Sequence, residues 1–139
     1  MAGRRIFIDT SYIYALINPN DQWHSAAAEW RYKINTKTDR LITSEFILAE
    51  VADGLASLAF RKAASVAIRL LQSDQSVEIH PASSNLFERA MDLFESRADK
   101  DWGLTDCTSF VVMRDFDLMD ALTTDGHFQQ AGFNPLLRV

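Results

Sequence analysis

Four acidic residues that lie far apart in the sequence stand where predicted strands end or within predicted helices near those ends. They are Asp9, Glu50, Asp106 and Asp125. Clusters made only of carboxylates are the ligand sets that hard, oxygen-preferring cations such as Mg²⁺ and Mn²⁺ require. If these side chains meet in one pocket, the sequence predicts a divalent-metal site suited to hydrolysis of a phosphodiester bond.

Two of these acids also have simpler structural explanations. Asp9 ends a short apolar stretch and could cap the helix that follows, although Thr10 and Ser11 can serve as caps as well. Glu50 lies in an otherwise apolar helix, where an acid either points to solvent or is held inward by a partner. Taken alone, Glu50 is better explained as a solvated side chain.

The other two acids are equally ambiguous when each is taken alone. Thr105 could be the N-cap of an apolar helix, which would place Asp106 in its first turn, where the helix dipole favours a carboxylate. Asp125 precedes Gly126, and an Asp before Gly is common in turns. Only the four acids together favour a metal site.

The elements that must position these acids follow from the hydrophobic pattern. Strands are predicted over 5–9, 41–43, 77–80, 119–123 and 136–138, and helices over 10–17, 22–37, 44–55, 60–73, 84–97 and 104–116. Because helices separate most of the strands, we predict an α/β fold, with a mainly parallel sheet of about five strands and helices on both faces. Ligands of such folds bind beyond the carboxyl ends of the strands, which is where we expect the acids to meet.

Soft metal ligands are sparse in the sequence. Cys107 and the three histidines, His24, His80 and His127, show no spacing typical of a zinc site. His127 follows Asp125 closely and could contact a substrate, but a surface position is the favoured interpretation. A single cysteine excludes an intramolecular disulfide and fits a reducing compartment.

Four short segments, in this order, resemble the PIN domain. They are Ile8–Ser11, Leu48–Val51, Leu104–Cys107 and Leu122–Phe128. The resemblance covers essentially the whole chain, which is read as a single PIN domain over 1–139. The length is similar to that of single-domain bacterial members such as the VapC-type toxin of a toxin–antitoxin pair.

The resemblance implies a Rossmann-like PIN fold and an endoribonuclease that depends on Mg²⁺ or Mn²⁺. The acidic residues of the family fall on the four acids above, and its supporting hydroxyls fall on Thr10, Ser11, Thr105 and Thr123. We hypothesise that Asp9 and Asp106 are the primary metal ligands. Glu50 and Asp125 would bind the metal directly or through water. A homodimer and a small antitoxin partner are also expected.

The charge of the chain bears on whether it binds RNA. The net charge is −5, and an acidic protein is not expected to attract phosphate. Two bound divalent cations would offset about four negative charges in the pocket and reverse the local field. The densest basic run is Arg31, Lys33, Lys37 and Arg40, which is the candidate for contact with RNA, although a solvated helix face is the favoured interpretation.

Other classes of protein fit the sequence less well. No segment approaches the roughly 18 apolar residues of a membrane span, and the apolar stretch near the N-terminus is too short for a signal peptide, so a cytoplasmic protein is predicted. A nuclease acting on structured DNA would carry large insertions. The remaining alternative is a catalytically silent PIN domain that binds RNA or protein, although four retained acids argue against it.

Overall fold

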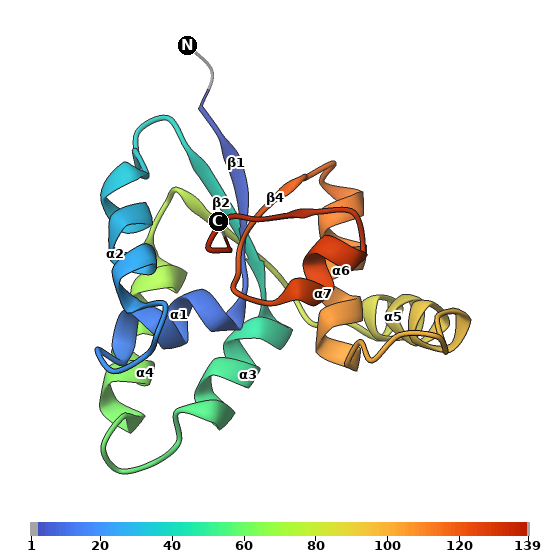
Figure 1. The fold of residues 1–139 in the computed structure, drawn as a ribbon, viewed down its shortest axis with the longest axis horizontal. Helices are drawn as coiled ribbons and strands as arrows, with labels where there is room; N and C mark the ends of the chain where they lie inside the picture. Colours follow the sequence, from blue (N-terminus) through green and yellow to red (C-terminus); the bar gives the residue numbers. More distant parts are fainter. Residues whose placement is uncertain (1–2, 139) are drawn as a thin grey trace.

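The computed structural model describes residues 3–138, in which five parallel strands form one sheet (Figure 1). The strands are β1 (Arg5–Ile8), β2 (Arg40–Ser44), β3 (Val77–His80), β4 (Asp120–Leu122) and β5 (Asn134–Pro135). Their spatial order is β3-β2-β1-β4-β5, and every neighbouring pair is parallel. The predicted α/β fold with a parallel sheet is therefore confirmed.

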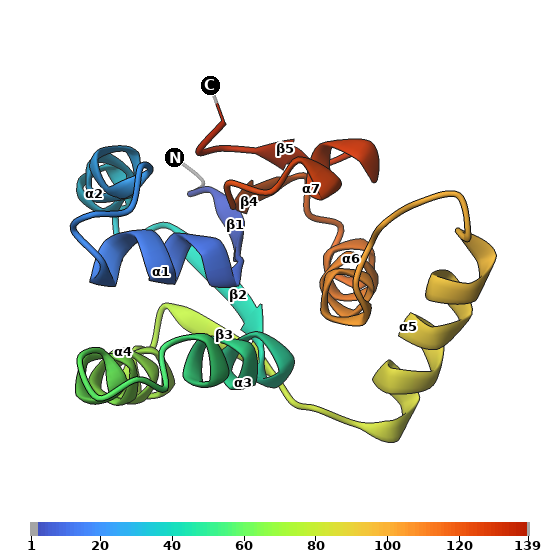
Figure 2. The same cartoon turned by 60° about the horizontal axis from the view of Figure 1, so that its bottom comes forward.

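Helices cover both faces of the sheet. They are α1 (Thr10–Ile17), α2 (His24–Lys33), α3 (Glu45–Gly54), α4 (Arg61–Ser73), α5 (Ser84–Ser96), α6 (Leu104–Asp115) and α7 (Gly126–Gln130). Figure 2 shows α1, α2 and α4 on one side of the sheet, with α6 on the other side and α5 packed outside it. Helix α3 contacts both α1 and α6, so it lies between the two helical layers.

The central strand β1 is buried on both faces, as its continuous apolar sequence requires. Ile6, Phe7 and Ile8 are each at most 1 % exposed. The core continues through aromatic side chains on the α6 side of the sheet. Phe110 of α6 meets Phe128 of α7 edge to face, with ring centroids 5.0 Å apart. This packing places the start of α7 beside the start of α6.

Helix α2 is shorter than the predicted span of 22–37. At its start, the Asp21 carboxylate accepts a hydrogen bond from the backbone N–H of Trp23. Beyond its end, the buried Asp39 carboxylate accepts from the backbone N–H groups of Asn35 and Arg4. The chain therefore leaves the helix after Lys33 and turns towards β2, because Asp39 provides an alternative acceptor.

The C-terminal region also differs from its prediction. Helix α7 was not predicted, and β5 lies at Asn134–Pro135 rather than over 136–138. Both elements are too short for hydrophobic periodicity to reveal them. Within residues 3–138, none of the helices combines the length and apolar character that a membrane crossing would need.

Candidate metal centre

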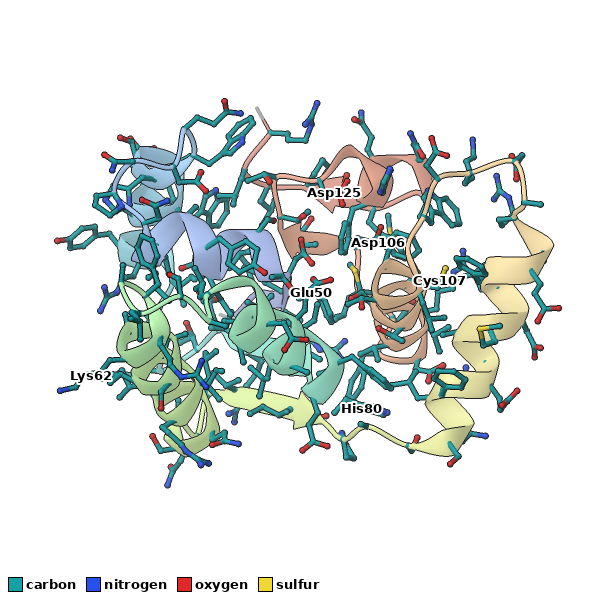
Figure 3. The ribbon with its side chains drawn as sticks, turned by 90° about the horizontal axis from the view of Figure 1, so that it is seen from below. Glu50, Lys62, His80, Asp106, Cys107 and Asp125 are labelled. Atoms are coloured by element: carbon teal, nitrogen blue, oxygen red, sulfur yellow. The ribbon has the colours of Figure 1, made fainter. Side chains whose placement is uncertain are left out.

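A pocket of about 600 Å³ opens at the carboxyl edge of the sheet, and all four predicted acids line it. Asp9 follows β1, Glu50 comes from α3, Asp106 from the first turn of α6, and Asp125 precedes α7. Figure 3 shows the labelled side chains of Glu50, Asp106 and Asp125 around the same space, each reaching it from a different element. We call this the acidic pocket.

Asp9 is the most buried of the four acids, with 5 % of the residue exposed. Its Oδ2 accepts hydrogen bonds from Ser11 Oγ at 2.9 Å and Thr123 Oγ1 at 2.7 Å, and its side chain does not cap α1. Burial raises the pKa of Asp9 from its ordinary 3.8 to about 6. The two hydrogen bonds partly oppose that shift, and the charges of Asp106 and Glu50 add to it.

Glu50 is held in the acidic pocket by a partner rather than left fully in solvent. Its carboxylate accepts a hydrogen bond from Thr10 Oγ1, and the residue is half-buried. The Tyr14 hydroxyl donates to the backbone carbonyl of Glu50 at 2.9 Å. Gly54, one turn further along α3, leaves room for Tyr14, because a Cβ at that position would collide with the tyrosine hydroxyl.

Asp106 belongs to the first turn of α6, which begins at Leu104 as predicted. Gly103 is its N-cap residue, and the Gly103 N–H lies 3.3 Å from Asp106 Oδ2, to which it donates. The predicted N-cap role of Thr105 is therefore wrong. Burial raises the pKa of Asp106, the charge of Asp125 raises it further, and a hydrogen bond with His127 opposes the shift.

Asp125 caps a helix and also lines the acidic pocket. Its Oδ1 accepts from the backbone N–H of His127 at 2.8 Å, so it caps α7, and it also faces the acidic pocket. Its own N–H donates to Thr123 Oγ1 at 3.0 Å. Because Thr123 also donates to Asp9, this buried hydroxyl links two of the acids directly.

The predicted supporting hydroxyls differ in what they contact. Thr10, Ser11 and Thr123 each hydrogen-bond a carboxylate of the acidic pocket. Thr105 lines the pocket, but among residues 3–138 its hydroxyl makes no hydrogen bond to an acid. Three of the four hydroxyls therefore orient the acids, and Thr105 only lines the acidic pocket.

His127 lies inside this cluster, so the surface position favoured from the sequence is wrong. Its Nδ1 is 3.0 Å from Asp106 Oδ2 and 3.4 Å from Asp125 Oδ1, and its side chain is 31 % exposed. Arg138 was not predicted either. It reaches the rim of the pocket, where its guanidinium donates to the carbonyl of Thr124. Only knowledge of α7 would have placed His127 beside Asp106.

The predicted basic run does not reach the acidic pocket. Lys33 ends α2, Lys37 lies in the connection that follows, and Arg40 begins β2. Because the strands are parallel, the start of β2 lies at the opposite edge of the sheet from the acids. Arg31 lines a separate groove. Contact between this run and RNA stays a prediction.

The donor set of the acidic pocket fits a hard divalent cation. Carboxylate and hydroxyl oxygens dominate its lining, and among the residues that the structure describes this lining includes no lysine or arginine. Burial disfavours the ionised form of Asp9 and neighbouring negative charge adds to this effect, which a bound cation would offset. The four acids are the residues that would hold such an ion.

Comparison with known proteins finds relatives over most of the chain. Residues 6–134 match the sequence model of the PIN domain. The 23S rRNA-specific endonuclease VapC20 of Mycobacterium tuberculosis is 31 % identical over 129 residues, which cover 92 % of this chain and 95 % of that protein.

Solved structures show the same fold. The crystal structure of M. tuberculosis VapC20, described as a sarcin–ricin loop cleaving toxin, has a TM-score of 0.84 and 28 % identity over 94 % of this chain and 97 % of that one. FitAcB from Neisseria gonorrhoeae matches with a TM-score of 0.64 and 20 % identity, covering 94 % and 97 % of the two chains. VapBC2 from Rickettsia felis, bound to a DNA fragment, matches with a TM-score of 0.64 and 15 % identity, covering 91 % and 92 %. The chain belongs to the PIN domain family.

Proposed function

We propose that this protein is a Mg²⁺- or Mn²⁺-dependent endoribonuclease that hydrolyses phosphodiester bonds of RNA. The observation that carries the proposal is the acidic pocket, in which acids from four separate elements line one cavity. The similarity over most of the chain to an endonuclease specific for 23S rRNA supports RNA as the substrate, and a structured loop of ribosomal RNA as the substrate class.

The four acids of the pocket would have different roles in metal binding and proton transfer. Asp9 and Asp106 would be the primary ligands, because both are largely buried and the charge of Asp106 acts on Asp9. Glu50 is half-buried and Asp125 is more exposed than Asp106, so we propose that they bind the ion directly or through water, and one of them would accept the proton of the attacking water. A bound divalent cation supplies activation of a water near neutral pH and neutralises charge on the phosphate.

The hydroxyls keep the carboxylates in place before any ligand arrives. Ser11 and Thr123 both donate to Asp9 Oδ2, which leaves Oδ1 without a protein donor among the hydrogen bonds of residues 3–138. Thr10 similarly occupies one oxygen of Glu50. Fixed outer partners of this kind orient ligands and typically change metal affinity or activity about 10–100-fold when removed.

The test is cleavage of labelled RNA stem-loops, including a ribosomal sarcin–ricin loop, in Mg²⁺, Mn²⁺ or EDTA. We expect cleavage by the wild-type protein with a metal and none in EDTA. Asp9→Asn and Asp106→Asn should each abolish it, whereas Asp92→Asn, at an exposed position on α5, should not. If the wild-type protein binds the RNA but cuts none in either metal, the alternative of a catalytically silent PIN domain is correct.

We also infer a small antitoxin partner, since the similar M. tuberculosis protein is described as a toxin. A groove of about 580 Å³ between α1, α2 and α4 has a mostly apolar lining, and Leu70 at this groove is 64 % exposed. We expect a partner helix to cover it, in a protein that acts in the cytoplasm. Leu70→Asp should abolish co-purification with the product of a neighbouring small reading frame, whereas Leu58→Asp, in the loop before α4, should not.

A further inference from the structure

His127 presents one ring nitrogen to two carboxylates of the acidic pocket. Its Nδ1 lies 3.0 Å from Asp106 Oδ2 and 3.4 Å from Asp125 Oδ1. These three potential ligand atoms all lie within 4.8 Å of one another. The 3.0 Å distance to Asp106 is that of a hydrogen bond, whereas the 3.4 Å distance to Asp125 is longer than a usual hydrogen bond, and the same Asp125 oxygen already accepts from the His127 backbone N–H.

The distances match those between neighbouring ligands of one metal ion. In an octahedral site with bonds of about 2.1 Å, adjacent ligand atoms lie about 3.0 Å apart. Side chains of Asp106, Asp125 and His127 are 19 %, 34 % and 31 % exposed, so one side of the cluster is open to water or to a phosphate. The three side chains could therefore hold one ion and leave some of its coordination positions free.

Contacts of His127 and of its neighbour Phe128 fix the position of the His127 side chain. Its backbone N–H donates to Asp125 Oδ1 at 2.8 Å, which sets the first turn of α7. The next residue, Phe128, is fully buried and packs edge to face on Phe110 of α6 at 5.0 Å between centroids. Because α6 also carries Asp106, the core holds the imidazole and this carboxylate together.

We propose that His127 is a direct ligand of the catalytic cation through Nδ1, together with Asp106 and Asp125. The proposal rests on the metal-dependent function proposed above and adds a nitrogen donor to its acids. Mg²⁺ is bound almost entirely by oxygen ligands, whereas Mn²⁺, although it also prefers oxygen ligands, accepts an imidazole more readily than Mg²⁺ does. An imidazole ligand would therefore favour Mn²⁺ over Mg²⁺.

The test is pulsed electron paramagnetic resonance of Mn²⁺ bound to the full chain, without RNA. We expect the wild-type spectrum to show the ¹⁴N modulation of a coordinated imidazole. His127→Gln should remove that modulation, weaken Mn²⁺ binding about tenfold or more, and reduce the preference for Mn²⁺ over Mg²⁺. His80→Gln is the matched control, because His80 ends β3 away from the three labelled acids (Figure 3) and should leave the modulation intact.

The outcomes separate this proposal from the function on which it rests. Mn²⁺ binding and metal-dependent cleavage without ¹⁴N modulation would overturn the role of His127 and leave the nuclease standing. Modulation that persists in His127→Gln would overturn it as well. If the wild-type protein binds no Mn²⁺ and cleaves nothing, the proposed function itself fails. A wild-type spectrum without modulation overturns the role of His127 even if the variant does not fold.

Discussion

Asp9 should destabilise the metal-free protein at neutral pH. The residue is 5 % exposed, and burial raises the pKa of its carboxyl from 3.8 to about 6. The carboxyl of Asp9 therefore binds its proton more tightly in the folded protein than in the unfolded chain. The stability that the protonated carboxyl contributes is fully present below about pH 4. It is lost as the pH rises through about 6. At pH 8 the ionised carboxylate therefore opposes folding unless a cation is bound.

Asp9→Asn removes that charge and keeps an oxygen that can accept from Ser11 and Thr123. The difference between a pKa of 3.8 and one of about 6 is about 2 units, and each unit corresponds to about 1.4 kcal/mol. In EDTA at pH 8, the variant should therefore be more stable than the wild type by up to about 3 kcal/mol. At pH 4 the gain should nearly vanish, because the wild-type carboxyl is then protonated in the folded state.

Urea denaturation of both proteins, followed by circular dichroism at pH 4 and pH 8, measures this difference. Addition of Mn²⁺ at pH 8 should stabilise the wild type and leave Asp9→Asn nearly unchanged, since ligand binding to the folded state adds stability. Asp92→Asn, at an exposed site on α5, should show neither effect. A variant that is less stable than the wild type in EDTA at pH 8, or a gain equal at both pH values, would refute the reasoning.

Three further predictions concern the support of the pocket and the assembly. Thr123→Val removes a donor to Asp9 and a buried acceptor for a backbone N–H, so it should cost about 1–3 kcal/mol in urea denaturation and lower cleavage about 10–100-fold. Gly54→Ala should displace Tyr14 and lower the melting temperature, whereas Gly103→Ala, whose Cβ meets nothing within 4 Å, should have little effect. Light scattering should give a homodimer, with twice the 15.7 kDa mass of one chain, and a monomer at micromolar concentration would contradict this.

Most of the acidic pocket could be predicted because its residues follow from the topology of a parallel sheet. The apolar run of β1 ends directly at Asp9, and Asp125 follows the apolar residues of β4. Once the strands are parallel, these positions must share an edge. Glu50 was less certain, because an acid on a helix faces inward only if a partner holds it, and the Thr10 hydroxyl is that partner.

The remaining features depend on packing that the sequence does not display. Helix α7 spans only Gly126–Gln130, and its place depends on Phe128 packing against Phe110, more than a dozen residues away. Without that contact, nothing distinguishes His127 from a surface histidine. The basic residues form a run in the sequence, but Lys37 precedes β2 and Arg40 begins it, so both lie at the amino edge.

The acidic pocket and the start of β2, where the basic run ends, lie at opposite edges of the sheet, and this affects how the protein would bind RNA. Among the described residues, those lining the acidic pocket include no lysine or arginine, and Arg138 only reaches its rim, so attraction of a phosphate into the pocket depends mainly on the cation. Chelation should therefore weaken RNA binding and not cleavage alone. Fluorescence anisotropy of a labelled stem-loop, measured before cleavage at matched ionic strength, should show weaker binding in EDTA than in Mn²⁺. Equal affinity would mean that the distant run around Lys37 and Arg40 binds the RNA, and Lys37→Glu should then weaken binding where chelation does not.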